Sequence, residues 1–542
     1  MKRILSYIIL SAGITAVPLR LLAFPPETGD SALWRDFTYV STVDPWLTGG
    51  NAAALTRFAS HNISRAEVKM EYGNGGFVDY AQSHRTFKAG AEVESFYRLN
   101  RRTVVYGNMS YDNYSGKDMA GSVFIDPTHK PFDIVEDSLT NTGTKHLDTY
   151  KLAGGVGVDI YHGISLGARI DYTAANYAKY KDLRHKNSLM DFVLTPGVYV
   201  PIGKSVSFGA DYRYRRNTES LEYSTYGKTE KKYMSLISYG AFMGRLEQFG
   251  TTGYTGSNNE MPLLDEYNGG GIQAEWRITP QLSWYNSFDI SDRDGYYGRK
   301  SSYTITYSTH HSRLYGYESR ITLRYPQAVH LLDVSVKSEN LENYENSYSE
   351  VINSSGASTY QYDDALKRAN RLWIDSKVGY TGYFGIEGDM PVWTISTAVN
   401  MARRKQTAYL YPYYRRQNIH STEGTVDITR NLKLANGVLS LSAGASYLKG
   451  GGEPYEDGTY AEPSDKQSAP PSMEAYLYRE YEYLTAPQYS VHGSVGYTFH
   501  IPQSRMDGYM KLYTDYRKTN SSNDYLLGRD HTVLRITVGS TF

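Results

Sequence analysis

The sequence of 542 residues contains no cysteine. That absence excludes structural disulfides, Cys-ligated zinc and iron–sulfur clusters, and it excludes a lipid-modified N-terminal cysteine. Net charge is lacking as well, because 57 basic residues balance 57 acidic ones. There is therefore no basic bias towards nucleic acid, and we expect neither a nucleic-acid partner nor a cofactor.

Long hydrophobic runs are also lacking. Beyond the N-terminus no apolar stretch approaches the ~20 residues that a membrane helix needs, and the mean hydropathy is −0.52. A helical membrane protein is therefore excluded. The same low hydropathy is compatible with a transmembrane β-barrel, because only alternate residues of its strands have to be apolar.

Alternation is what the sequence does have, and it is clearest on either side of the turn at 201–204. One set of every second residue is apolar: Phe192, Leu194, Pro196, Val198, Val200, then Val206, Phe208, Ala210, Tyr212 and Tyr214. The complementary set is more polar and includes Asp191 and Arg215. Strand side chains point to opposite faces with a period of two, so the pattern predicts a hairpin with one apolar and one polar face. Such hairpins recur to Phe542 and predict a transmembrane barrel with its polar face in the lumen.

Short and long connections alternate along the chain. The predicted turns lie at 100–101, 162–163, 201–204, 279–281, 326–327, 385–391, 435–437 and 502–503. The predicted long connections lie at 114–146, 217–264, 294–312, 344–365, 402–418, 450–485 and 518–526. Outer-membrane barrels have short periplasmic turns and long extracellular loops. We predict one antiparallel up-and-down barrel of about 18 strands, within a range of 16 to 20, and segments 230–245 and 299–311 fit either strand or loop.

The chain ends support this class. Residues 1–23 resemble a signal peptide, with a basic start at Lys2 and Arg3 and an apolar stretch to Val17. Residues 24–61 are interpreted as a periplasmic or inward-folded N-terminal segment, and 62–542 as the barrel. At the other end Leu534, Ile536 and Val538 alternate with polar residues before Phe542. A terminal aromatic residue closing such a strand resembles the signal read by the outer-membrane assembly machinery.

Three short motifs suggest chemistry and are better explained otherwise. Gly163–Gly167 matches the G-x-S-x-G nucleophile elbow, but an alternating strand follows where the elbow needs a helix. His310 and His311 are adjacent, so a regular strand would point them to opposite faces and they could not share a metal. Asp292–Gly295 resembles part of a calcium loop without the required ligand spacing, and an acidic turn is favoured. We therefore predict no catalytic, metal or cofactor residues.

The predicted lumen face carries charges of both signs. These candidate lumen-lining residues are Arg169, Asp171, Asp191, Asp211, Arg213, Arg215, Glu275, Arg277, Glu318, Arg320, Arg324, Asp333, Lys337, Lys377, Asp427, Lys511, Asp515 and Arg535. A water-filled pore tolerates such charges, and rings of them set selectivity. Alternatively, the charges pair across the lumen and close it. The sequence leaves both readings open.

The whole mature chain resembles the large, uncharacterised outer-membrane barrel families of Bacteroidota, which carry a signal peptide and Tyr-rich strands, and this sequence has 53 Tyr against 16 Phe. A second, local resemblance is weaker. Gly50–Leu55 is similar to the Asn-Pro-Ala segment of long-chain fatty-acid transporter barrels, with Ala52 where that family has Pro. That likeness implies an N-terminal segment that forms an internal hatch.

Three functions are weighed. The leading hypothesis is an outer-membrane channel or passive transporter for a small solute, with a hydrophobic one left open. The alternative is a structural or interaction barrel that partners a surface lipoprotein, a receptor or a secretion component through its long loops. A membrane-embedded hydrolase is least favoured, because no Ser/His/acid group stands out among 13 His. For this protein we expect contacts with outer-membrane lipid and with the outer-membrane assembly machinery.

Overall fold

The structure is a computed structural model that describes residues 34–542 except 137–140, 226–231, 252, 258–259, 353, 355 and 505. The predicted signal peptide, 1–23, and the start of the 24–61 segment lie outside the described residues. None of the helices in the described part of the chain is long and apolar enough to cross a membrane. Residues 35–542 form one unit.

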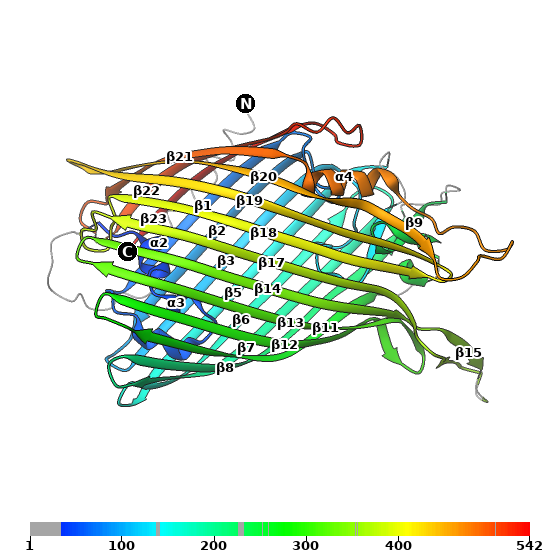
Figure 1. The fold of residues 1–542 in the computed structure, drawn as a ribbon, viewed down its shortest axis with the longest axis horizontal. Helices are drawn as coiled ribbons and strands as arrows, with labels where there is room; N and C mark the ends of the chain where they lie inside the picture. The colour runs from blue at the N-terminus through cyan, green and yellow to red at the C-terminus, as the bar shows by residue number, and fades with distance from the viewer. Residues whose placement is uncertain are drawn as a thin grey trace. The chain divides into compact units, whose positions relative to one another are not determined.

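Eighteen strands of this unit form one closed antiparallel barrel (Figure 1). They are β1 (Ile63–Asn74), β2 (Arg85–Arg98), β3 (Thr103–Met119), β5 (Gly143–Tyr161), β6 (Ile164–Lys179), β7 (Arg184–Ile202), β8 (Val206–Ser224), β11 (Met261–Arg277), β12 (Leu282–Ser301), β13 (Thr304–Tyr325), β14 (Ala328–Glu345), β17 (Leu366–Phe384), β18 (Trp393–Leu410), β19 (Tyr413–Leu434), β20 (Gly437–Thr459), β21 (Gln488–His500), β22 (Asp507–Thr519) and β23 (Asp530–Thr541). Each pairs with the next along the chain, and β23 pairs with β1. Closure leaves no unpaired barrel edge. The predicted fold and strand number are confirmed.

The barrel exterior is apolar, as the alternation predicts. Large apolar side chains are exposed on strand after strand: Val68, Ile170, Phe208, Ile272, Ile290, Ile321, Leu332, Val378, Val399, Ile428, Leu441, Val495, Leu512 and Ile536. A soluble monomer rarely exposes a contiguous apolar patch of more than a few hundred Å². The outward face of this barrel therefore has the character of a surface that contacts lipid.

Two predicted loops and one predicted turn are wrong, and the structure assigns the two segments that fitted either strand or loop. The segments 294–312 and 402–418 are not loops, because β12–β13 and β18–β19 extend through them and turn tightly at 302–303 and 411–412. The segment 299–311 belongs largely to barrel strand β13, whereas 230–245 supplies β9 (Met234–Gly240) and the start of β10 (Met243–Gln248), which lie outside the barrel sheet. The motif Asp292–Gly295 lies within β12 rather than in a turn. Polar residues on strands that extend past the apolar band carry no signal that separates strand from loop.

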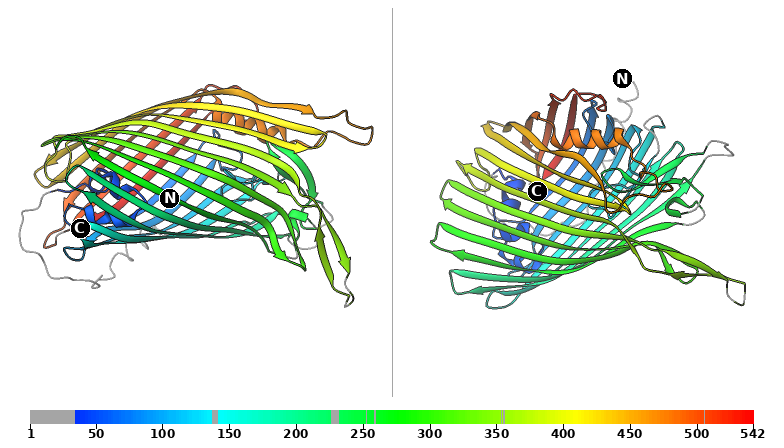
Figure 2. Two further views of the ribbon diagram at one scale, coloured as in Figure 1. Left: turned by 60° about the horizontal axis from the view of Figure 1, so that its bottom comes forward. Right: turned by 45° about the vertical axis from the view of Figure 1, so that its right-hand side comes forward.

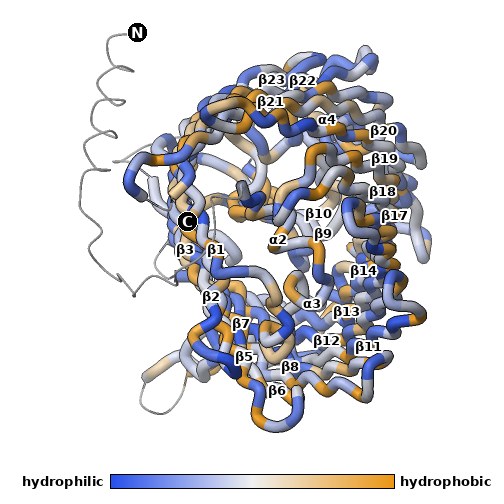
Figure 3. Tube along the Cα trace, turned by 90° about the vertical axis from the view of Figure 1, so that its left-hand side faces the viewer, coloured by the Kyte–Doolittle hydropathy of each residue, from blue (hydrophilic) through white to orange (hydrophobic). Residues whose placement is uncertain are grey.

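Two bodies lie inside the ring. Near the short turns, at the left of Figure 1, are α2 (Phe37–Thr42) and α3 (Pro45–Thr48), followed by the 3₁₀ helix η1 (Ala52–Arg57). Near the long loops are β4 (Asp133–Glu136), β9, β10, the 3₁₀ helix η2 (Gly253–Thr255) and α4 (Glu474–Thr485). The view along the barrel shows α2, α3, β9 and β10 within the circle of strands (Figure 3). We call residues 35–61 the N-terminal insert, and residues 120–136, 233–251 and 253–257 with α4 the long-loop insert.

Candidate functional site: a chamber inside the barrel

The N-terminal insert crosses the lumen. Its helix η1 packs on β5, β6 and β7, whereas Phe37 and Tyr39 share a buried cluster with Val329 and Tyr383 of β14 and β17. These two groups of strands lie far apart around the ring, so one segment can contact both only from inside it. Residues 35–61 therefore lie inside the ring of strands.

Side-chain caps explain why this short segment is ordered locally. Asp36, Asp44 and Asn51 precede α2, α3 and η1, and each accepts a hydrogen bond from the backbone N–H two residues on, at 2.8, 3.0 and 3.1 Å. Such caps satisfy N–H groups that the first turn of a helix leaves without partners. Pro45 adds a residue that suits the first helical position. These capping residues are visible in the sequence, but sequence reasoning did not predict the three short helices.

A row of glycines receives the insert. Gly157, Gly167 and Gly197 are direct neighbours across β5, β6 and β7. A β-carbon built on them would lie 2.5 Å from the Ala52 oxygen, 2.2 Å from the Ala53 nitrogen and 2.3 Å from the Asn51 Oδ1. Real β-carbons do not approach other atoms so closely, so only glycine allows the insert's backbone to rest on this wall.

Polar contacts complete this attachment. The Asn51 side-chain amide donates to the Val198 carbonyl and to Gln273 Oε1, both at 3.0 Å. The Trp46 indole N–H donates to Glu275 at 2.9 Å. Arg57 lies 3.2 Å from the same carboxylate, which is thereby shared by two residues of the insert. Because buried polar groups are costly without partners, these bonds fix one position for the insert.

The long-loop insert is held chiefly by buried charges. Lys130 donates to Glu219 of β8 at 2.8 Å, and the other oxygen of that carboxylate accepts from the Ile125 N–H at 2.9 Å. Deeper in the insert, Glu136 of β4 pairs with Lys145 and Lys179 of the wall, and all three side chains are buried. A buried pair resists the loss of either partner, because the remaining charge would have no compensation.

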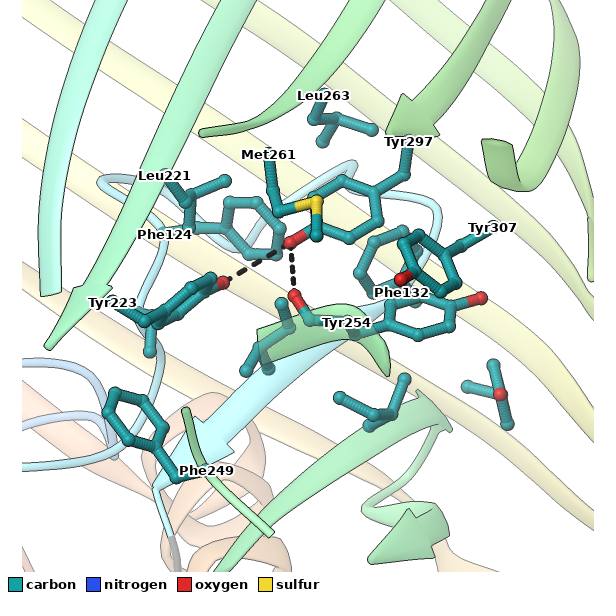
Figure 4. Packing of buried hydrophobic residues seen from close by; sticks show 14 of the residues in the cluster. Phe124, Phe132, Leu221, Tyr223, Phe249, Tyr254, Met261, Leu263, Tyr297 and Tyr307 are labelled. Carbon is teal, nitrogen blue, oxygen red and sulfur yellow. Dashed lines mark hydrogen bonds between the residues drawn. The ribbon is translucent and has the colours of Figure 1, made fainter. Parts of the chain in front are cut away.

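Aromatic residues of the insert and the wall also pack together in a buried cluster (Figure 4). Phe132 of the insert packs edge-on against Tyr254 and Tyr297. The Tyr297 hydroxyl donates to the Tyr254 carbonyl at 2.6 Å and lies 3.3 Å from the Tyr223 hydroxyl. These phenols are buried, so a hydrogen-bond partner for each hydroxyl decides whether the cluster is stable.

Arg293 of β12 joins the insert to the wall. Its guanidinium donates to Asp265 and to Glu339, each at 2.9 Å, and to the His129 carbonyl at 2.9 Å. His310 contributes its Nε2 to the same Asp265 at 2.6 Å. The planar guanidinium, with its several donors, suits this simultaneous contact with two strands and a loop.

Between the two inserts lies a chamber of about 730 Å³. The N-terminal insert contributes Trp46 and Asn51, the long-loop insert contributes His129 and Lys130, and the rest of the lining comes from β7, β8, β11, β12, β13, β14 and β17. Nine carboxylates and five Lys or Arg side chains line it. The chamber is therefore polar, has an excess of negative charge and is large enough for a small solute.

The structure places six of the predicted lumen residues in the chamber wall: Asp191, Asp211, Arg213, Arg215, Glu318 and Lys337. Another four contact the N-terminal insert or pair with a residue that does: Glu275, Arg320, Arg324 and Asp333. The other eight share the inward face of their strands without lining the chamber: Arg169, Asp171, Arg277, Lys377, Asp427, Lys511, Asp515 and Arg535.

Many of these charges pair with one another, within one strand or across one or two strand spacings. Arg215 binds Asp191 through two hydrogen bonds of 2.8 and 2.9 Å. Further pairs are Arg169–Asp171, Arg320–Asp333, Lys337–Glu318, His492–Asp427 and Arg535–Glu71. The sequence left open whether the inward charges line a passage or lock together. Along much of the wall they lock together, and the chamber keeps carboxylates in excess.

Sequence reasoning missed several chamber residues. Asp289 lies between Phe288 and Ile290, which are both outward and apolar, so the same alternation would have identified it. Asp265, Arg293 and Glu339 lie where the strands continue beyond the apolar band, and there the alternation gives no contrast. Nothing in the sequence marks Lys130, because its position depends on how a long connection folds back.

The structure also locates the C-terminal strand residues and the short motifs of the sequence analysis. Leu534, Ile536 and Val538 are exposed on the outward face of β23, and the Phe542 backbone pairs with Ser64 where the barrel closes. Their role as an assembly signal stays a prediction. A strand, β6, follows Gly163 as predicted, and His310 is buried whereas His311 is exposed on the opposite face. In the described part of the chain, no group of three potential metal ligands gathers.

The family of unknown function DUF6850 matches residues 52–542. No curated protein matches this sequence. Similar solved structures include the ferric preacinetobactin receptor BauA from Acinetobacter baumannii, with 8% identity, a TM-score of 0.40 and coverage of 89% of this chain and 80% of that one. The outer membrane transporter YddB from Escherichia coli shows 8% identity, a TM-score of 0.39 and coverage of 88% and 81%. The copper transporter OprC shows 9% identity, a TM-score of 0.36 and coverage of 89% and 81%.

Structural similarity as weak as this gives no information about the solute that the protein binds or transports.

Proposed function

The chain belongs to a family of unknown function (DUF6850), and we propose that it is a gated, passive transporter of the bacterial outer membrane. The single observation that carries this proposal is the chamber of about 730 Å³ between the two inserts. A barrel that served only as a scaffold would have no need of a solute-sized, charged cavity in its lumen. The apolar exterior supports the membrane location.

The proposal refines the sequence-based expectation about the solute. The chamber lining is dominated by charged and hydroxyl-bearing side chains, with few apolar ones. Desolvating those groups against a hydrophobic molecule would leave them without partners, which costs free energy. A polar solute is therefore favoured over a hydrophobic one. The relation to Bacteroidota barrels and the contact with the assembly machinery stay predictions.

Passage requires one insert at each end to move. Glu219 holds Lys130 and the Ile125 N–H, so it fixes the long-loop insert above the chamber. In proteoliposomes the wild-type protein should admit small polar solutes slowly. Glu219→Gln should admit them several-fold faster, because the amide cannot compensate the Lys130 charge. Glu222→Gln, on the same strand but exposed, is the matched control and should leave uptake unchanged.

A folded, monomeric Glu219→Gln barrel that admits no more solute than protein-free vesicles would overturn the transporter proposal. Far-UV circular dichroism and a heat-modifiable gel shift establish folding first. Planar-bilayer recordings of the same two variants give a second reading, in which Glu219→Gln should spend more time in its conducting level.

A second candidate function is an interaction barrel, and one feature favours it. The hairpin of β15 (Tyr348–Ile352) and β16 (Ser358–Tyr362) forms a two-stranded sheet separate from the barrel sheet and projects beyond the ring of strands (Figure 2). Val351 and Ile352 are exposed on it. A surface lipoprotein or receptor partner that uses this hairpin should co-purify in stoichiometric amount with the full chain and not with a chain that lacks 348–362.

A further inference from the structure

One row of directly paired residues crosses the chamber wall over six neighbouring strands. It runs Asp211 (β8), Gly271 (β11), Asp289 (β12), Gly316 (β13), Lys337 (β14) and Asp375 (β17). Directly paired residues point to the same side of a sheet, and all six line the chamber. The glycines give the neighbouring carboxylates room: Asp211 Oδ2 lies 3.2 Å from where a β-carbon on Gly271 would stand, and Asp289 Oδ1 lies 2.4 Å from that position on Gly316.

The carboxylates of this row are only partly compensated. Lys337 is matched by Glu318 at 3.5 Å, so it does not neutralise its neighbours in the row. In the described part of the chain no side chain forms an ion pair or hydrogen bond with Asp289 or Asp375. These two carboxylates therefore face the chamber without a cationic partner among the described residues.

Asp211 supplies an independent sign of a missing partner. Its side chain is only 2% exposed, and its Oδ2 accepts a hydrogen bond from Gln273 at 2.6 Å. Its Oδ1 is buried and accepts no hydrogen bond, while the Arg213 guanidinium stays 3.9 Å away, beyond hydrogen-bond distance. A buried carboxylate oxygen without a donor is costly, and a donor that enters the chamber would satisfy it.

We propose that the chamber binds a small linear organic dication of the aliphatic diamine class, along the row from Asp211 to Asp289. This inference deepens the proposed function by naming the solute class. One strand, β11, lies between these residues, so two strand spacings put their carboxylates roughly 10 Å apart. A four-carbon diamine spans roughly 6 Å between nitrogens, and each ammonium–carboxylate hydrogen bond adds about 2.8 Å. Such a molecule reaches both carboxylates at once along the row.

A single metal ion fits this spacing poorly. Oxygen ligands of a divalent cation lie within about 2.6 Å of it, so carboxylates roughly 10 Å apart cannot share one ion. Consistent with this, the described residues hold no group of three metal ligands. The ammonium groups of a diamine need no such convergence, since each takes its own carboxylate.

Isothermal titration of the detergent-solubilised full chain with 1,4-diaminobutane tests the inference. Wild type should bind with one site per chain and with an affinity that weakens as salt rises. Butylamine should bind at least tenfold more weakly, and 1,4-butanediol should not bind. Asp289→Asn and Asp211→Asn should each weaken the diamine by about tenfold or more, whereas Asp292→Asn, on the same strand and paired with Arg313 outside the chamber, should not.

The outcomes separate this inference from the proposed function. Absence of diamine binding to folded wild type, or equal binding by Asp289→Asn and wild type, overturns the diamine site even if liposomes show solute uptake. Diamine binding that depends on Asp289 in a protein that never permits uptake supports the site and overturns the transporter. Equal binding of butylamine and the diamine overturns the two-carboxylate arrangement.

Discussion

The two inserts inside the barrel are held by opposite means. The N-terminal insert rests on a wall from which side chains have been removed, so that its backbone meets Gly157, Gly167 and Gly197 directly. The long-loop insert meets a wall that presents ions, and Glu136 and Glu219 each bind lysine in a buried site. Close backbone packing, completed by polar contacts, holds the first insert, whereas buried ion pairs and aromatic packing hold the second.

The difference matters for how each insert can be released. Close packing depends little on pH or salt, and it is lost only when atoms are added or removed. A buried ion pair depends on both partners and on their protonation. We therefore expect the long-loop insert to respond to charge and pH, and the N-terminal insert to respond to side-chain volume.

The largest expected effect comes from Glu136→Gln. Lys145 and Lys179 would lose their shared carboxylate while they stay buried, which costs about 3–5 kcal/mol in comparable cases. The β4 segment should detach, and hydrogen exchange at 120–136 should rise by orders of magnitude while 35–61 keeps its protection. Glu260→Gln removes an exposed pair with Arg299 and should leave exchange at 120–136 unchanged. Equal protection of β4 in Glu136→Gln and wild type would contradict charge as the means of attachment.

Gly167→Ala is the matching test at the other end. The added methyl group would lie 2.2 Å from the Ala53 nitrogen, a backbone atom that cannot turn aside. Overpacking of this kind costs about 1–3 kcal/mol, so the N-terminal insert should shift and bilayer conductance should rise. Gly154→Ala adds the same methyl group to β5 where nothing lies within 4 Å and should behave as wild type. If Gly167→Ala showed wild-type conductance and wild-type hydrogen-exchange protection at 35–61, close packing against Gly167 would not be what holds the N-terminal insert.

The contrast between the two inserts also explains how much the sequence could reveal. Alternation predicted the barrel, because lipid outside and water inside impose opposite demands on neighbouring residues. It did not predict β9, β10 or the ion pair between Lys130 and Glu219, since these depend on connections that fold back into the lumen.

The candidate site was therefore only partly predictable. Asp211, Arg213 and Arg215 follow from the alternation at the 201–204 turn and do line the chamber. Asp375 follows the same inward alternation in β17 and was passed over. No rule of local sequence says that Asp211 and Asp289 belong to one row, because that depends on register between strands far apart in the chain.

A smaller effect is expected from pH, and it should reach only the long-loop insert. Burial, aided by the carboxylate of Glu480 on α4, raises the pKa of Asp79 to about 7. The packed state therefore favours protonated Asp79, and the stability it contributes is present at low pH and lost as pH rises through about 7. Protection factors of 474–485 should fall between about pH 4 and pH 7 and level off above pH 7. Asp79→Asn should remove most of that fall, and a wild-type-like fall in the variant would exclude Asp79 as its cause.

The smallest effect sharpens the comparison within one row of the wall. The diamine row runs on through Gly197 to Gly167, so Gly316→Ala makes the same change as Gly167→Ala in a part of the row that no insert covers. Its methyl group would lie 2.4 Å from Asp289 Oδ1, the mobile end of a side chain, which can turn away. Stability should change by less than about 1 kcal/mol, conductance should stay at the wild-type level, and 1,4-diaminobutane should bind a few-fold more weakly because Asp289 is displaced. Gly424→Ala, which meets open space, is the control for both readings. If Gly316→Ala raised conductance as Gly167→Ala is expected to, the methyl group would act by disturbing the barrel strands and not by displacing the N-terminal insert.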